Sequence, residues 1–336
     1  MKERNSNLEL LRLLCIVGIV SMHVFGLYKN EDLILTRGIC TLLNNALCNF
    51  GTTVFILISG YFGLHFKKEK LFNLWNIALF WSLVLIGIEP DSSTKHIVKS
   101  VFPIFTGKYW FLTAYIIIYC LSSFIERFIS QLNRMQFQQM LAIFLLFFYI
   151  APTFLLLDIL HDSGKGIVNL FVAYLVGRYI ALHGFPHKIC GLKWFWGLII
   201  VIVSIIFINL AVTLASGTLF QKMSRDNSIF TLLEAVAVLC TILQMKPRTI
   251  KWVNNLASYV FPIYVIHYAL IPRLVIIPDS THNILYLMIW ANAISISLIS
   301  IGLELIRRLI FKKSFSLLIQ LEVKLTNRCI KHLQLD

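Results

Sequence analysis

The chain has 336 residues and a formal net charge of +14; 58% of its residues are hydrophobic and 14% are charged. A soluble domain carries about 25% charged residues, so this composition excludes an ordinary soluble protein. The seven cysteines include no Cys-x-x-Cys pair and predict neither a zinc site nor a disulfide framework.

Apolar stretches recur along the whole chain. Each is close to the roughly 20 residues that a helix needs to cross the hydrocarbon core of a bilayer. They predict an all-α fold, a multi-span transmembrane helical bundle of about ten spans. In chain order the predicted spans are 8–28, 42–64, 72–88, 108–126, 140–157, 166–183, 194–216, 228–245, 256–277 and 284–311. The second contains Gly51 and Gly60 and the ninth contains Pro262 and Pro272, so both are expected to be interrupted.

Lysine and arginine are distributed unevenly between the predicted loops. Most of them fall in the N-terminal segment, in the loops expected on the same side, and in the segment after the last span. This bias places both termini in the cytoplasm, and it explains the net charge without a nucleic-acid partner. We expect a transmembrane domain over residues 1–311 and a basic cytoplasmic tail over 312–336, with membrane lipids around the bundle.

The first predicted span carries two ionisable residues, Arg12 and His23. They are separated by almost three helical turns, so they point within about 20° of each other and lie roughly 16 Å apart along the axis. An ionisable group at this depth marks a candidate functional site, because burying it in lipid is costly. A neutral imidazole can accept a proton from a hydroxyl or take up an acyl group. The alternatives are a packing role for His23 and an Arg12 that reaches lipid phosphates or pairs with Glu9.

Three further residues in late spans are candidates. Tyr264 and His267 lie three positions apart on one helix face, where they either line the same cavity and stabilise a developing oxyanion or pack between helices. Glu234 lies within the eighth predicted span, where a carboxylate must be paired or protonated. It is a candidate to orient a histidine or bind a sugar hydroxyl. The pair Ser59-Gly60 predicts close approach of two helices.

Four stretches, in order, resemble the acyltransferase 3 family of integral membrane acyltransferases. They are Asn7–Arg12 followed after ten residues by His23, Val54–Tyr61 with its Ser-Gly pair, Tyr109–Tyr115 with Trp-Phe-Leu, and Ser258–His267 with Tyr-x-x-His. The likeness extends over nearly the whole chain, so residues 1–311 are expected to form an acyltransferase domain. The absence of an appended hydrolase-like domain resembles members that O-acetylate surface polysaccharides.

The chain departs from the family at one loop. Some members carry Arg-x-x-Arg after the second span, whereas this loop reads Phe66–Lys70 and offers Lys67, Lys68 and Lys70. Lysine keeps the positive charge but lacks the bidentate fork that holds a phosphate. The three lysines are therefore expected either to bind an anionic donor less selectively or to serve only as a cytoplasmic loop.

The resemblance implies acetyl-CoA as the acyl donor and no metal. Its phosphates would lie near Arg12 and the basic loop, and its thioester would reach towards His23. His23 would act as general base or as transient acyl carrier, and the residues do not decide between these routes. The acceptor would be a hydroxyl of a cell-surface polysaccharide or of its lipid-linked precursor, outside a bacterial plasma membrane.

A transporter or flippase is the alternative from another class of protein. Interrupted helices and buried histidines that relay protons are typical of such proteins. Paired half-chains would support it, but the two halves share no sequence similarity. Release of coenzyme A distinguishes the two functions, because a transporter releases none.

Overall fold

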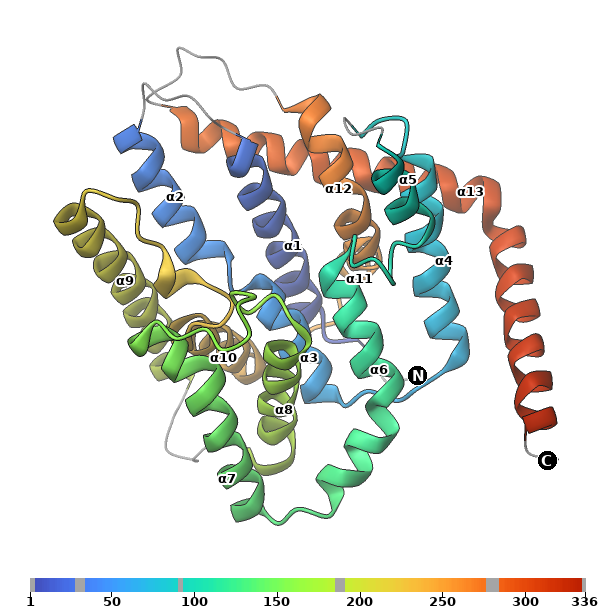
Figure 1. The fold of residues 1–336 in the computed structure, drawn as a ribbon, viewed down its shortest axis with the longest axis horizontal. Helices are drawn as coiled ribbons and strands as arrows, with labels where there is room; N and C mark the ends of the chain where they lie inside the picture. Colours follow the sequence, from blue (N-terminus) through green and yellow to red (C-terminus); the bar gives the residue numbers. More distant parts are fainter. Residues whose placement is uncertain (1–3, 28–33, 90–92, 185–190, 276–283, 334–336) are drawn as a thin grey trace.

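The computed structural model describes residues 4–27, 34–89, 93–184, 191–275 and 284–333 (Figure 1). These residues form helices joined by loops, without a strand among them. The helices are α1 (Ser6–Leu27), α2 (Ile34–Cys48), α3 (Gly51–Phe62), α4 (Lys68–Val84), α5 (Thr94–Val101), α6 (Trp110–Ser130), α7 (Arg134–Leu145), η2 (Leu146–Leu155), α8 (Ile167–His183), α9 (Gly191–Ser216), η3 (Lys222–Ser224), α10 (Ile229–Gln244), α11 (Lys251–Ala257), α12 (Val260–Leu274) and α13 (Leu285–Leu333).

Six helical segments within the described residues are long and apolar enough to cross a membrane. They are α1, the α2–α3 pair, α6, the α7–η2 pair, α9 and α13, and the shorter apolar helices α8, α10 and α12 lie between them in the chain. The predicted all-helical membrane fold is therefore confirmed. The number of spans and the side on which each terminus lies stay predictions.

The second predicted span is interrupted as expected. α2 ends at Cys48 and α3 begins at Gly51, and a Cβ at Gly51 would lie 3.2 Å from the Cys15 carbonyl oxygen of α1. In the ninth span the break falls earlier than the prolines predicted, between Ala257 and Val260. Pro262 lies in the first turn of α12, where a helix needs no N–H donor.

α3 and α8 pack against each other with almost no space between their backbones. A Cβ on Gly60 would collide with the Tyr174 carbonyl oxygen, and one on Gly177 would collide with that of Leu57. Backbones approach this closely only where side chains are absent. The predicted role of the Ser59-Gly60 pair in helix packing is therefore confirmed for Gly60.

The last helix, α13, continues without a break past residue 311, where we expected the tail to begin. Its C-terminal turns lie beside α4 (Figure 1). Asn76 Nδ2 donates to Glu322 Oε2 at 2.8 Å, and Lys68 Nζ donates to Asn327 Oδ1 at 2.6 Å. The end of the chain is thus joined to the helix that follows the basic loop.

Candidate functional site

One face of α1 lines two separate cavities. Arg12, Ile16 and Ile19 line the first, of ≈160 Å³. Met22 and His23 line the second, of ≈560 Å³. The other lining residues of the first cavity come from α3, α4, α6 and α12.

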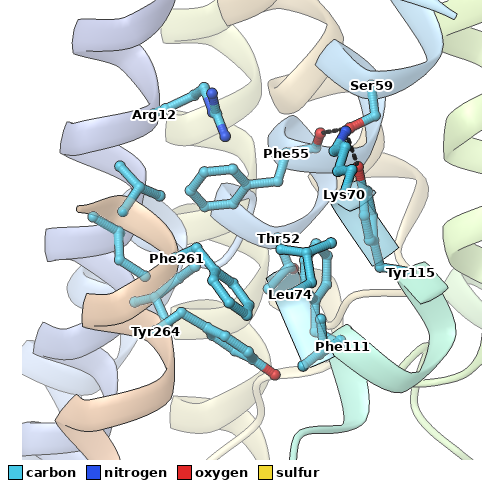
Figure 2. A pocket seen from close by; sticks show the side chains of 14 residues that line it. Arg12, Thr52, Phe55, Ser59, Lys70, Leu74, Phe111, Tyr115, Phe261 and Tyr264 are labelled. Carbon is cyan, nitrogen blue, oxygen red and sulfur yellow. Dashed lines mark hydrogen bonds between the residues drawn. The ribbon is translucent and has the colours of Figure 1, made fainter. Parts of the chain in front are cut away.

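The first cavity is apolar with two cationic side chains at one end. In Figure 2, Arg12 and Lys70 lie towards the end near Ser59, and Tyr264 and Phe111 lie towards the opposite end. The remaining lining residues are Ile16, Ile19, Thr52, Phe55, Leu74, Leu112, Tyr115, Val260 and Phe261. The shape suits a ligand with an anionic end and a narrow, less polar arm.

Arg12 is held at the mouth of this cavity by a neighbour on its own helix. Its Nη1 lies 3.2 Å from Glu9 Oε2, and its Cζ lies 5.9 Å from the centre of the Phe55 ring. The Arg12 side chain is 37% exposed, and that of Glu9 is 13% exposed. The pairing with Glu9 raised from the sequence is therefore present, and it leaves much of the guanidinium free to meet a ligand.

The basic loop is anchored through the hydroxyl of Tyr119. That hydroxyl accepts from the Lys67 backbone N–H at 2.8 Å and donates to the His65 carbonyl at 3.1 Å. Of the three predicted lysines only Lys70 lines the first cavity, with its Nζ 4.9 Å from the centre of the Tyr119 ring. Lys68 turns instead towards α13.

A pair of histidines lies between α1 and α12. The rings of His23 and His267 have their centres 5.2 Å apart, and the Tyr264 ring lies 6.3 Å from that of His267. His267 is 2% exposed, and its Nδ1 lies 3.0 Å from the Ile263 carbonyl oxygen. A carbonyl only accepts, so Nδ1 carries the proton and Nε2 presents a lone pair. Nε2 has no hydrogen-bond partner among the described residues, so its lone pair is not engaged by the protein.

The second cavity is polar and is built largely from loops. His23 opens onto it from α1, Asn45 from α2, and Asn49 from the turn between α2 and α3. The segments before α8 and before α10 supply the other side chains, which are Ser163, Lys165, Leu219, Phe220, Gln221, Lys222, Ser224, Arg225 and Asp226. No sequence motif marks these loop residues.

One hydrogen bond connects the walls of the two cavities. Thr52 lines the first cavity, and its hydroxyl donates at 2.9 Å to Oδ1 of Asp226, which lines the second. The cavities have no lining residue in common. His23, which lines the second cavity, and Tyr264, which lines the first, both lie against the buried His267.

Glu234 lies apart from the histidines. It is 1% exposed, lines neither cavity, and lies near the Cys15 and Cys48 thiols. Its Oε1 has no partner in the described part of the chain. The structure therefore brings together Arg12 with Lys70, and His23 with His267 and Tyr264, but gives Glu234 no contact with either set.

A buried charge cluster on α13 is a feature that the sequence analysis missed. Glu304 is fully buried and accepts from Arg307 at 2.6 Å, from Arg308 at 2.8 Å and from the Trp81 indole at 2.9 Å. Both arginines lie at the end of the last predicted span, and the loop charge count groups them with the tail that follows it. Their spacing of three and four residues after a glutamate is the signal that predicts pairing.

Comparison with known proteins identifies a family but no individual relative. The acyltransferase domain family that the four sequence stretches resemble matches residues 5–305. No curated protein and no solved structure matches the chain. Within the described residues, no three histidine, cysteine, aspartate or glutamate side chains are grouped to hold a metal ion.

Proposed function

We propose, because the chain belongs to the acyltransferase 3 family of membrane acyltransferases, that it moves an acetyl group from acetyl-CoA to a sugar hydroxyl. The acceptor would belong to a cell-surface polysaccharide or its lipid-linked precursor, at a bacterial plasma membrane. The observation that carries the proposal is the contact of His267 with both His23, which lines the polar cavity, and Tyr264, which lines the apolar one.

The first cavity is the proposed donor site. Its volume of ≈160 Å³ is well below the roughly 300 Å³ at which pockets for drug-sized ligands begin. It therefore suits the narrow pantetheine arm, while the nucleotide would stay outside, near Arg12 and Lys70. Guanidinium and ammonium groups both bind phosphate, the first in a bidentate manner and the second as a point charge.

The second cavity is the proposed acceptor site. Amide, hydroxyl and charged side chains line it, and His23 is exposed to it. Such groups match the hydrogen-bonding capacity of a sugar. With the N-terminal end of α1 in the cytoplasm, as loop charge predicts, this cavity would face the opposite side of the membrane.

The proposed transfer needs one proton acceptor between the two sites. A histidine nitrogen takes the hydroxyl proton as the acceptor oxygen attacks the thioester carbon. The carbon–sulfur bond then breaks, and the departing thiolate recovers the proton from the imidazolium. The Tyr264 hydroxyl would donate to the thioester oxygen as it gains charge.

A two-step route uses the same atoms. An imidazole nitrogen of His23 would attack the thioester, release the thiolate and carry the acetyl group as an acyl-imidazole. The acceptor hydroxyl would then attack that carbon, and the imidazole would leave. His267, with its Nε2 lone pair, would accept the hydroxyl proton in this second step and then release it, which balances the proton that the thiolate takes up.

Thiol release from acetyl-CoA by the purified protein in lipid nanodiscs tests the proposed function. We expect release by the wild type and a loss of about a hundredfold or more in His23→Ala, the range typical of a general base. His183→Ala is the matched control, because that histidine packs on Tyr179 and lines neither cavity. Absence of both donor binding and thiol release in folded protein would favour the transporter instead.

A further inference from the structure

We propose that the acceptor is an anionic amphiphile, a sugar carried on a lipid phosphate. Its headgroup would occupy the second cavity and its chain an adjoining apolar groove. This inference rests on the proposed function for its chemistry, but the two binding surfaces that carry it are independent of the donor site.

The second cavity has an excess of positive charge. Lys165, Lys222 and Arg225 line it, and none forms an ion pair with a carboxylate among the described residues. The one acidic lining residue, Asp226, is buried and accepts a hydrogen bond from Thr52. Cations gathered in a cleft attract an anionic ligand and strengthen its hydrogen bonds, so the cavity is complementary to phosphate.

An apolar groove of ≈780 Å³ adjoins this cavity, between α1, α2 and α9. Its apolar lining residues include Phe25, Leu42, Leu210 and Leu214. The groove and the cavity share Met22, Asn45, Leu219 and Gln221 as lining residues, so one passes directly into the other.

The groove lies at the edge of the bundle. Only 11% of the apolar window of α9 is buried, so this helix faces the bilayer along most of its length. Leu214, at 68% exposed, shows that the groove opens on that side. A hydrocarbon chain in the membrane could therefore lie in the groove while the attached phosphate meets the cations.

His23 determines which part of the amphiphile would react. It lines the polar cavity next to Met22, which lines both the cavity and the groove. A hydroxyl close to the phosphate end of the headgroup would then reach the histidine. A finished neutral polysaccharide would use neither the excess charge nor the groove.

Binding to the protein in phosphatidylcholine nanodiscs, without any donor, tests the inference. The probes are a polyprenyl diphosphate-linked sugar, an alkyl glycoside of the same sugar, and the sugar 1-phosphate. We expect the first to bind at least about tenfold more tightly than either other probe, since a hydrogen bond to a charged group contributes about 1.5–3 kcal/mol. Equal binding of the neutral glycoside or of the chain-less phosphate overturns the proposal. Equal displacement by an anionic phospholipid also overturns it.

Four variants separate the two halves of the site. Lys222→Gln should weaken binding of the diphosphate-linked probe about tenfold and leave binding of the alkyl glycoside unchanged. The exposed Lys95→Gln is its control.

Leu210→Trp should fill the groove and weaken binding of both chain-bearing probes, but not of the sugar 1-phosphate. Val203→Trp, on the exposed side of α9, is its control. Acetyl-CoA binding is measured in parallel, so a failure of the donor site is seen separately from a failure of this inference.

Discussion

His23 on α1 and His267 on α12 face each other with ring centres 5.2 Å apart, although 244 residues separate them in the chain. Only His267 has a fixed tautomer, because its Nδ1 is held by the Ile263 carbonyl. The two rings are therefore not equivalent, and substitution can distinguish the role of each nitrogen.

His267→Asn should lower acetyl transfer by about a hundredfold while leaving the fold intact. The asparagine amide replaces the Nδ1–H donor towards Ile263 but has no atom in place of Nε2. Transfer rate and thermal unfolding are measured on the same preparation. A wild-type rate in this variant would show that Nε2 takes no part in the reaction.

Arg12→Gln should weaken acetyl-CoA binding by about tenfold or more, since hydrogen bonds to charged groups contribute about 1.5–3 kcal/mol. The affinity of Arg12→Lys for acetyl-CoA should lie between those of the wild type and Arg12→Gln. Lysine keeps the positive charge but lacks the guanidinium geometry that holds a phosphate with two hydrogen bonds. Isothermal titration with coenzyme A measures the effect. Glu9→Gln is the control: it frees the guanidinium, so weaker binding in that variant would contradict a role for Arg12 in binding phosphate.

Gly177→Ala should destabilise the protein by on the order of 1–3 kcal/mol, the usual cost of overpacking. The added methyl would meet the Leu57 carbonyl, and a backbone atom cannot move aside without separating α3 from α8. Gly197→Ala on α9 is the matched control, with nothing within 4 Å of the added carbon. Unfolding in detergent, monitored by intrinsic fluorescence, should show a lower stability for Gly177→Ala than for Gly197→Ala.

Binding of the diphosphate-linked sugar should weaken as pH rises through about 6. Burial raises the pKa of Asp226 to about 6, and Asp162 adds to the rise while Thr52 and Lys165 oppose it. Below that pH the carboxyl is neutral, and above it the carboxylate repels an anion. The same shift means that Asp226 contributes stability below about pH 4, which is lost as pH rises through 6. Asp226→Asn should flatten the binding profile between pH 5 and pH 7, and an unchanged slope would assign the effect to another group.

The sequence predicted the helices, and it indicated several residues of the candidate site, for definite physical reasons. Hydropathy identifies lipid-crossing helices, and helical spacing places Tyr264 and His267 on one face. The sequence marks His23 and His267 separately as candidates, but their contact joins distant helices and no local pattern predicts it. Lys165, Lys222 and Arg225 lie in loops without a repeating pattern, and their convergence depends on how α8, α9 and α10 are arranged.

The charge cluster of Glu304, Arg307 and Arg308 on α13 shows a different limit of prediction from sequence. Arg307 and Arg308 contribute to the bias that orients the chain, yet they lie beside a carboxylate inside the protein. Charge counting cannot separate a loop cation from one that compensates a buried anion. The burial of Glu304 depends on Trp81 and α4, which are distant in the sequence.

The two cavities have no lining residue in common, and the Thr52–Asp226 bond and the histidine pair lie where their walls meet. For an enzyme acting as proposed, this arrangement lets a two-carbon unit leave the cytoplasm while its carrier stays behind. The cell would then need no store of activated acetate outside, and the modification of its envelope would follow the metabolic state within. The same partition would also prevent the protein from becoming a leak for ions.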